Sequence, residues 1–468
     1  MGTELGSLST ALSALQSERK ALEVTGQNIA NANTAGYTRQ RANMQAVGGS
    51  VQPAMYSKSD GIGNGVTVVD VQRLQDAFLE QRANTENGAL SSLNVSQQTY
   101  SDIENSFGEP GATGIQNLLS TFANGWDDVA NNPKDPGART ALIGDAQSVA
   151  SALNTSSSAL NAQWASSKQT LNSEVGQIND AATNIAALNK AIVAAANAGN
   201  SPNDLMDQRD SLIRSVASMI GVTTKPQADG STDVLIGGSS LVSGSLARQL
   251  TVGGASALDQ VAATPVSLSW ADSGTAVNAT TGDVGGYLTS LNSTIPSYSD
   301  QLDAIASSLV TAVNAQQALG YDLNGAAGGN FFDPTKTTAA NIAVTISDPN
   351  TVAASAVGPT VDANGNTVPS LDGANAQLIA STSLKPTSDT YRQMIVQLGS
   401  ASQSVQQKTS TQQAVVQQVQ TSRDSAAGVD LDEEQTNLIS YQQAYNAAAQ
   451  YVTVINSVLD TLINRMLA

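Results

Sequence analysis

Apolar residues recur at both ends of the chain with the alternating three- and four-residue steps of a coiled-coil seam. At the C-terminal end the steps are unbroken, through Leu438, Tyr441, Tyr445, Ala448, Val452, Ile455, Leu459, Leu462 and Met466. At the N-terminal end the pattern runs through Leu5, Leu8, Leu12, Leu15, Leu22 and Ile29, with Arg19 and Gly26 at the alternate position. Such a stripe needs a partner helix to cover it. We interpret these residues as an assembly seam in which the two terminal helices pair; packing of each helix on its own domain is the alternative.

The start of the C-terminal helix is marked by acidic residues. Asp430 and Glu433 have the spacing of a capping box. Asp432 and Glu434 add negative charge at the positive end of the helix dipole. We therefore predict that this helix begins directly after Asp430.

The composition excludes several kinds of chemistry. The 468 residues include 21 basic and 39 acidic side chains and no histidine, which gives a net charge of −18. A chain this acidic repels nucleic acid and anionic lipid, so neither is expected as a partner. Without cysteine and histidine, thiol and imidazole catalysis, disulfides and Cys/His zinc sites are ruled out. We expect no catalytic residues, no metal site and no cofactor.

Neither end is predicted to enter a membrane. No apolar run approaches the roughly 18–20 residues that a membrane-spanning helix needs. The first residues also lack the apolar core of a cleaved signal peptide. If the chain is exported, we expect a route that does not read such a signal.

The middle of the chain is dominated by predicted long helices. Residues 138–198 contain no proline, and Trp164, Leu171, Ile178, Ile185 and Ile192 recur there every seven residues. One helix of about 55 residues would span roughly 80 Å, which is longer than a globular core requires. Further helices are predicted from about residue 73 to 107, from 286 to 319 and from 388 to 425. The helical region predicted over 286–319 places four apolar residues on one face: Leu302, Ile305, Leu309 and Val313.

Stretches rich in glycine and asparagine interrupt these helices. Residues 222–285 and 333–375 are predicted as small β lobes, the second with a strand over Ile342–Ile346. Residues 60–65 are predicted to form a turn ahead of a strand over Val66–Val71. Asp362–Asn366 resembles a calcium loop, but it lacks the required later glycine and acid, so we predict a hairpin turn.

Three acids follow one face of a predicted helix in the middle of the chain: Asp204, Asp207 and Asp210. Ser201 is expected to cap this helix and Gly221 to end it. Arg209 and Arg214 lie among the acids, and Asp210 and Arg214 have the spacing of a helical ion pair. We therefore interpret the acids as a solvent-exposed charged face rather than as a metal site.

These patterns predict a mainly α, elongated chain with small β lobes. Its terminal helices would pair as a coiled-coil pole, followed by a long-helix bundle and then by β-rich insertions. We expect a terminal assembly domain over residues 1–45 and 426–468, and a long-helix domain over 46–221, 286–332 and 376–425. A small β lobe over 222–285 and an outer β/loop insert over 333–375 complete the expected division.

Two segments at the chain ends carry a family resemblance. Residues 28–40 read NIANANTAGYTRQ, and residues 431–445 read LDEEQTNLISYQQAY. They resemble the signatures shared by the axial proteins of the bacterial flagellum, which include rod, hook and hook-associated proteins. We take five residues as the N-terminal signature: Asn28, Asn31, Asn33, Gly36 and Tyr37. The asparagines disfavour a helix interior, and Gly36 can take a positive φ and end the helix.

The middle of the chain resembles one branch of these axial proteins. Residues 203–212 read NDLMDQRDSL and are similar to a segment typical of the hook-associated protein 1 family, whose members form the hook–filament junction. Residues 126–139 and 320–332 also resemble that family. The chain departs from it at residues 314–318, where the family often has a histidine, and its insert over 333–375 is short for the family.

The resemblance implies a structural, motility-related subunit that forms a homo-oligomeric ring by self-assembly through its terminal helices. The implied partners are hook protein, hook-associated protein 3, an export chaperone on the C-terminal helix and the flagellar type III export apparatus. The implied location is extracellular, at the hook–filament junction. Because the seams of a free subunit lack neighbours, we expect frayed termini before assembly.

Three alternatives remain open from the sequence. A hook or distal-rod protein would share the same ends. A secreted hydrolase on an axial scaffold would need converging carboxylates, yet adjacent acids such as Asp127 and Asp128, or Glu433 and Glu434, point about 100° apart on a helix. An adhesin would use the exposed β lobes as a binding surface.

Overall fold

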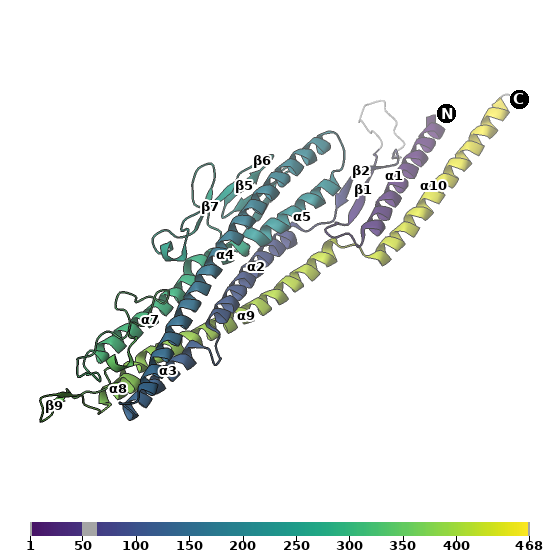
Figure 1. Cartoon of the computed structure of the whole chain (residues 1–468). Helices are drawn as coiled ribbons and strands as arrows, with labels where there is room; N and C mark the ends of the chain where they lie inside the picture. Colours follow the sequence, from purple (N-terminus) through teal and green to yellow (C-terminus); the bar gives the residue numbers. More distant parts are fainter. Residues whose placement is uncertain (1, 49–62, 467–468) are drawn as a thin grey trace. The chain divides into compact units, whose positions relative to one another are not determined.

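The computed structural model of the chain describes residues 2–48 and 63–466. Three predicted seam side chains, those of Leu5, Leu462 and Met466, lie outside the described residues. The described chain is mainly helical with a few small antiparallel sheets, which confirms the predicted class (Figure 1). None of the described helices is both long and apolar enough to span a membrane. The chain divides into two compact units.

The first unit comprises Met1–Gly88, Ile178–Gln249 and Gln413–Ala468. Its helices are α1 (Gly2–Asn31), the start of α2 (Ala77–Phe107), the end of α4 (Pro136–Asn197), α5 (Asn203–Ile220), the end of α9 (Lys385–Ala427) and α10 (Leu431–Met466). Its strands are β1 (Gln40–Ala46), β2 (Val66–Arg73), β3 (Thr223–Pro226), β4 (Thr232–Ile236), β5 (Ser239–Ser243) and β6 (Leu246–Ala247). β1 pairs with β2, and β3 to β6 form one sheet in sequence order.

The second unit comprises Ala89–Gln177 and Leu250–Gln412. It holds the rest of α2, α4 and α9 together with α3 (Ile115–Asn131), α6 (Gly282–Thr289), α7 (Ile295–Gln317) and α8 (Ala374–Leu378). Its strands β7 (Leu250–Gly253) and β8 (Ser267–Trp270) pair, as do β9 (Thr360–Val361) and β10 (Thr367–Val368). Short 3₁₀ turns lie at Leu258–Gln260 and Pro349–Thr351, and π turns at Ser290–Thr294 and Ile379–Ser383. The predicted division into a terminal domain, a long-helix domain and two lobes stays a prediction.

Periodic apolar residues form the interior faces of the long helices. The region predicted as one or two helices is the single 62-residue helix α4. All five of its predicted heptad residues are buried: Trp164, Leu171, Ile178, Ile185 and Ile192. The four apolar residues predicted to share a face of α7 are also buried: Leu302, Ile305, Leu309 and Val313. Burial follows sequence spacing here because a helix with a periodic apolar stripe turns that stripe away from solvent.

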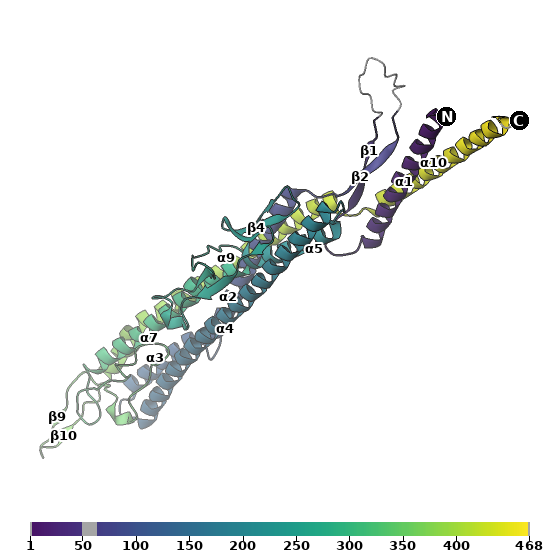
Figure 2. The same cartoon turned by 90° about the horizontal axis from the view of Figure 1, so that it is seen from above.

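The two terminal helices of the first unit pack on each other, as the sequence predicts. α1 and α10 run side by side and antiparallel, with both chain ends at the same end of the pair (Figures 1 and 2). Asp430 caps α10, because its Oδ1 accepts the backbone N–H of Asp432 at 2.9 Å and of Glu433 at 3.3 Å. The terminal seams therefore meet within one chain.

β1 and β2 form a hairpin beside α1. Gln40 pairs with Arg73, and the register shifts between Asn43 and Met44. The predicted strand over Val66–Val71 is confirmed within β2. The predicted turn before it falls partly on residues 60–62, outside the described residues, and Gly65 enters β2 with a φ of 103°.

Two predicted local features are wrong. The expected strand over Ile342–Ile346 is absent from the described residues there, where only one isolated bridge joins Val344 to Phe332. A β-branched run without a partner strand cannot form a ladder. The expected cap at Ser201 is also displaced, because α5 begins at Asn203 and Pro202 occupies the cap position without a side-chain bond. Gly221 does end this helix, with a φ of 65°. The predicted hairpin turn at Asp362–Asn366 joins β9 to β10.

Candidate assembly surface

The predicted C-terminal seam forms the inner face of α10. Its described members Leu438, Tyr441, Ala448, Val452 and Leu459 are half-buried, Ile455 is buried, and Tyr445 is the most exposed at 36%. Among the described elements, α1 is the one that packs extensively on α10. The seam therefore lies where α10 meets α1 of the same chain.

A second row of apolar side chains on α10 is uncovered. Tyr451, Val454 and Val458 follow one another at helical spacing and are 48%, 57% and 46% exposed. We call these three residues the outer row. Residues 435–459 also contain no charged side chain. An apolar and uncharged face on an exposed helix is the kind of surface that another protein covers.

On α1 the most buried face differs from the predicted leucine seam. The seam residues Leu8, Leu15, Leu22 and Ile29 are half-buried and Leu12 is 52% exposed. The most buried apolar residues are instead small: Ala11, Ala21 and Val24. α1 packs on the hairpin as well as on α10, and Ser17 Oγ donates to the carbonyl oxygen of Val66 at 3.1 Å. Small side chains suit this face because two elements approach it closely.

Asn28, the first signature residue, is 1% exposed and uses both ends of its amide. Its Nδ2 donates to the carbonyl oxygen of Gln40 at 2.8 Å and to Oε2 of Glu434 at 3.1 Å. Its Oδ1 accepts the backbone N–H of Gln40 at 3.0 Å and the hydroxyl of Tyr37 at 2.9 Å. Asn28 thus ties the end of α1 to β1 and to the first turn of α10.

Arg39 adds a second bond between the two signatures. Its Nε donates to Oε1 of Glu434 at 2.7 Å, and its Nη1 and Nη2 donate to the two oxygens of Glu433 at 2.9 and 2.7 Å. The hydrogen bonds to Glu433 raise the pKa of Arg39, and the same bonds lower the pKa of Glu433. Glu434 is 2% exposed, so Arg39 and Asn28 together compensate its buried charge.

The remaining signature residues shape the loop after α1. Asn31 Nδ2 donates to the Gln27 carbonyl oxygen at 3.0 Å, and its Oδ1 accepts the Thr34 hydroxyl at 3.2 Å. α1 ends at Asn31, so the prediction that Gly36 ends the helix is wrong, although Gly36 does take a positive φ of 83°. The Thr34 N–H already bonds to the Asn31 carbonyl oxygen, which turns the chain earlier. Asn33 is exposed.

Tyr37 lies within an acidic environment. Its burial, followed by the charges of Asp207, Asp204 and Glu434, raises the pKa of its hydroxyl to about 12. The hydroxyl therefore stays protonated and remains a donor to Asn28 at any physiological pH.

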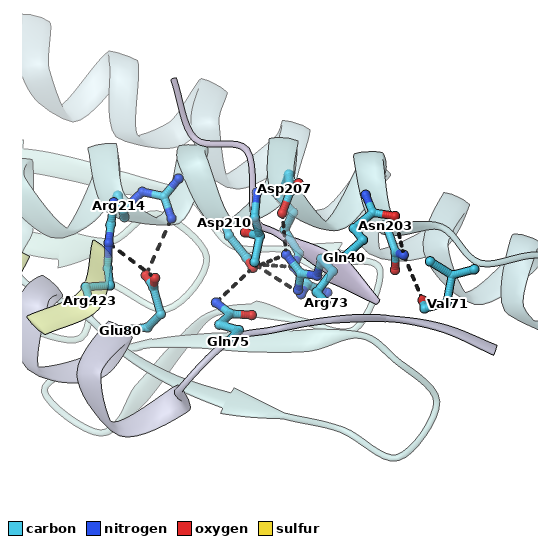
Figure 3. A network of polar contacts seen from close by, with 12 residues as sticks. Gln40, Val71, Arg73, Gln75, Glu80, Asn203, Asp207, Asp210, Arg214 and Arg423 are labelled. Carbon is cyan, nitrogen blue, oxygen red and sulfur yellow. Dashed lines mark hydrogen bonds and ion pairs between the residues drawn. The ribbon is translucent and has the colours of Figure 1, made fainter. Parts of the chain in front are cut away.

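Two of the three acids of α5, Asp207 and Asp210, belong to a largely buried ion network, whereas Asp204 is exposed. Arg73 Nη1 donates to Oδ1 of Asp207 at 2.7 Å and to Oδ2 of Asp210 at 2.9 Å (Figure 3). Burial alone lowers the pKa of Arg73, but Asp210 and Asp207 outweigh it and raise it. The predicted pair of Asp210 with Arg214 is not among the described bonds; Asp210 instead bonds to Arg73 and Arg209. The exposed-face interpretation is therefore wrong for Asp207 and Asp210, but Asp204 is exposed as predicted.

Arg209 and Asn189 connect this network to the β3–β6 sheet. Arg209 Nη1 donates to the Gly230 carbonyl oxygen at 2.8 Å and to Oδ1 of Asn189 at 3.4 Å. Asn189 in turn donates to the carbonyl oxygens of Thr232 and Gly244 at 2.9 and 2.8 Å. Burial lowers the pKa of Arg209, which Asp210 partly offsets.

Two further contacts bring the hairpin and α9 into the network. Asn203 Nδ2 donates to the Val71 carbonyl oxygen at 2.8 Å and to Oε1 of Gln40 at 3.0 Å (Figure 3). Glu80 of α2 pairs with Arg214 at 3.4 Å and with Arg423 at 3.6 Å (Figure 3). The network therefore fixes the base from which the α1–α10 pair extends within the first unit.

Hollows flank the signature loop on two sides. One of about 1040 Å³ is lined by residues 34–39 and by the α9–α10 connection at 427–433. Another of about 890 Å³ lies between this loop, α4 and α5, with Leu188 and Leu212 on its wall. Both have room for side chains of a protein partner.

The arrangement offers contacts rather than chemistry. No group of acids among the described residues has the geometry of a metal site. Glu433 and Glu434, one of the two acid pairs that a hydrolase could use, are both bound by Arg39. The sequence patterns do not identify three residues that are central to this site: Arg39, Arg73 and Glu434. Arg39 and Glu434 do lie inside the quoted signatures, which was the available signal.

Comparison with known proteins places both ends of the chain in the flagellar rod class. The family described as flagella basal body rod protein matches residues 8–38, and the flagellar basal body rod FlgEFG protein C-terminal family matches residues 420–466. The flagellar hook-associated protein FlgK helical domain matches residues 100–332. The ends therefore match rod-protein families, whereas the middle matches a hook-associated protein family.

Relatives that align over nearly the whole chain identify the family within the flagellar proteins. Flagellar hook-associated protein 1 of Bacillus subtilis is 30% identical over 98% of both chains, and that of Escherichia coli is 28% identical over 98% of this chain and 99% of its own. The chain belongs to the flagellar hook-associated protein 1 family, and its role is structural. A solved structure of the flagellar hook junction protein FlgK from Burkholderia pseudomallei has the same fold, with a TM-score of 0.62 and 19% identity over 74% of this chain and all of that one.

Proposed function

We propose that this chain is a subunit of the hook–filament junction that self-assembles through its terminal helix pair. The observation that carries the proposal is the outer row of α10: Tyr451, Val454 and Val458 stay 46–57% exposed after α10 has packed on α1. The half-exposed leucines of α1 extend this apolar surface. Burying such a surface against neighbouring subunits yields roughly 25 cal/mol per Å².

The charge distribution supports contact between identical copies. The net charge of the chain is −18, so like copies repel over most of their surface. Residues 435–459 carry no charge, and between Glu4 and Glu18 the chain has none either. The helix pair is thus where copies can meet at the least electrostatic cost, as a homo-oligomeric ring requires.

Membership of the hook-associated protein 1 family also supports a proposal about further partners. We infer contacts with hook protein below the ring and hook-associated protein 3 above it, and an extracellular location reached through the flagellar type III export apparatus. An export chaperone would cover α10 before assembly and so shield its outer row. The acids Glu433 and Glu434 serve here to bind Arg39, which supports a structural role for them.

A complementation experiment tests this function against the hook and distal-rod alternative. In a strain that lacks the junction protein but still builds hooks, expression of this chain should restore filaments and swimming. In a strain that lacks hook protein it should restore neither. Rescue of the hook-less strain, or failure to grow filaments on existing hooks despite confirmed export, would refute the assignment.

A further inference from the structure

A ring of identical copies needs two different surfaces on each copy. In a heterologous contact, one patch of a copy meets a different patch of the next copy, and a ring closes only when every copy carries both. The outer row of α10 is one apolar patch of this kind. A chain that assembles through this row must therefore also carry the patch that receives it.

A second apolar row follows α1. Leu8 and Leu15 are half-buried, and Leu12 between them is 52% exposed. We call these three residues the leucine row. The sequence has no charged side chain between Glu4 and Glu18, so this row is as free of charge as the outer row. Accessible apolar side chains in an uncharged stretch of helix favour a contact with another protein.

The leucine row lies on the side of α1 that is turned away from the β1–β2 hairpin. Ser13 and Ser17 face the hairpin, because Ser13 Oγ accepts the backbone N–H of Val66 at 3.3 Å and Ser17 Oγ donates to the Val66 carbonyl oxygen at 3.1 Å. With 3.6 residues per turn, Leu8 and Leu15 lie roughly opposite these serines. α10 packs on α1 between the two sides, and the hairpin and α10 flank α1 on different sides (Figures 1 and 2).

The outer row lies on the other side of the helix pair. Glu434 and Ile455 are the buried side chains of α10 among those described, and they mark the face that α1 covers. The outer row lies about 100° round the helix from this face. Seen along the pair from the chain ends, both rows are turned clockwise from the face where the two right-handed, antiparallel helices meet. Because the helices face each other, the same turn carries the two rows to opposite sides of the pair.

The two rows also lie at the same level along the pair. The hydrogen bond of 3.1 Å between Asn28 Nδ2 and Glu434 Oε2 fixes a common level for α1 and α10. Leu8 is 20 positions from Asn28, and Val454 is 20 positions from Glu434. At 1.5 Å per residue, both lie about 30 Å further along the pair. Copies placed side by side would therefore bring the outer row of one against the leucine row of the next without a shift along the helices.

We propose that the leucine row on α1 of one copy receives the outer row on α10 of the next, so that one repeated contact closes the ring. This inference rests on the proposed function, because it names the partner surface of the outer row. A second copy of the chain fits this surface for two reasons. The rows stand level on opposite sides of the pair, and both are uncharged in a chain whose net charge of −18 makes copies repel elsewhere.

Cross-linking of assembled single-cysteine copies tests the contact. The chain has no cysteine, so Leu8→Cys on copies with one tag and Val454→Cys on copies with another tag provide the only thiols in a mixture. After assembly on hooks, a short bis-maleimide should join the two kinds of copy into dimers that carry both tags. Their yield should exceed that of the free mixture about tenfold or more, because neighbours in a ring hold the thiols at a high effective concentration.

Ser9→Cys is the matched control for Leu8→Cys. Ser9 is exposed and adjacent in sequence, but it lies about 100° round α1 from Leu8. Its mixture with Val454→Cys should stay near the yield of the free mixture. If Leu8→Cys copies assemble poorly, Leu12→Cys is the second probe and should give the same mixed dimers.

Three results would overturn the pairing of the rows. The first is equal cross-linking of Ser9→Cys and Leu8→Cys to Val454→Cys. The second is dimers that join Val454→Cys copies to each other instead of mixed dimers. The third is the absence of mixed dimers with both probes in filaments that form normally, which would leave the proposed function intact. Failure of the unmodified chain to assemble on hooks would instead refute the proposed function, and the pairing with it.

Discussion

At the residue scale, the two terminal signatures are bound to each other. Asn28 and Glu434 are 406 positions apart in sequence, yet they share a buried hydrogen bond, and Arg39 bonds to the same carboxylate. In the sequence Asn28 stands out only as a poor helix former, but in the structure its side chain makes four hydrogen bonds. These contacts set where α10 starts relative to α1, and with it the position of the outer row.

Removing the Asn28 side chain should lower the stability of the first unit. Asn28→Ala leaves the buried Glu434 carboxylate and the Gln40 backbone short of partners, so we expect a loss of about 2–3 kcal/mol in unfolding free energy. Denaturant unfolding followed by circular dichroism measures it. Asn33→Ala is the matched control, because Asn33 is an exposed member of the same signature, and it should change stability by less than about 0.5 kcal/mol. Similar effects of the two variants would contradict the role given to Asn28.

A second prediction at the residue scale concerns the contribution of the α5 ion network to stability. Arg73→Ala leaves Asp207 and Asp210 as buried charges with reduced compensation, which should cost about 3 kcal/mol or more. Arg19→Ala removes a surface arginine whose side chain is 71% exposed, and it should cost at most about 0.5 kcal/mol. Urea unfolding of both variants separates the two cases. A loss below about 1 kcal/mol for Arg73→Ala would show that the network is not structural.

Such contacts could not be predicted from the sequence, for a physical reason. The acids Asp207 and Asp210 lie on a helix with arginines at short spacing, so the local pattern indicates an exposed face. Their actual partner, Arg73, is 134 and 137 positions away, and only the tertiary fold brings it near. A periodic apolar stripe is different, because it indicates burial whatever its partner is.

At the element scale, this difference explains which predictions hold. α4 and α7 carry strict apolar periods over several turns, and their predicted faces are the buried ones. The strand over Ile342–Ile346 was predicted from β propensity alone and fails because no neighbouring strand pairs with it. On α10 the seam lies inward as its period indicates. Nothing in that period distinguishes Tyr451, Val454 and Val458 as a separate exposed row.

The role of the outer row in assembly can be tested by introducing charged side chains into it. Val454→Asp combined with Val458→Asp places two charges on a face that we expect neighbours to cover, so export should continue while filaments no longer form on hooks. Thr453→Asp adds a charge to an exposed position on another flank of α10 and should still allow filaments. Filament counts by electron microscopy and the amount of exported chain provide the readouts. Normal filaments with the double variant would rule out this row as a contact.

At the scale of the whole molecule, α10 buries few of its side chains against the rest of its own chain. Among its described side chains, Glu434 and Ile455 are the buried ones, whereas α4 buries residues along most of its length. Helices with few buried contacts open at low free energy. This observation supports the prediction that the termini fray in the free subunit and become stable helices on assembly.

The most direct measurement of the central claim is the accessibility of the outer row before and after assembly. The chain contains no cysteine, so Val454→Cys introduces a single thiol whose rate of maleimide labelling can be followed. In the free subunit this thiol should react as an exposed group, because Val454 is 57% exposed. In subunits assembled on hooks, its rate should fall by about a hundredfold or more if neighbours bury it. Equal labelling rates in the free and assembled states would contradict assembly through this face of α10.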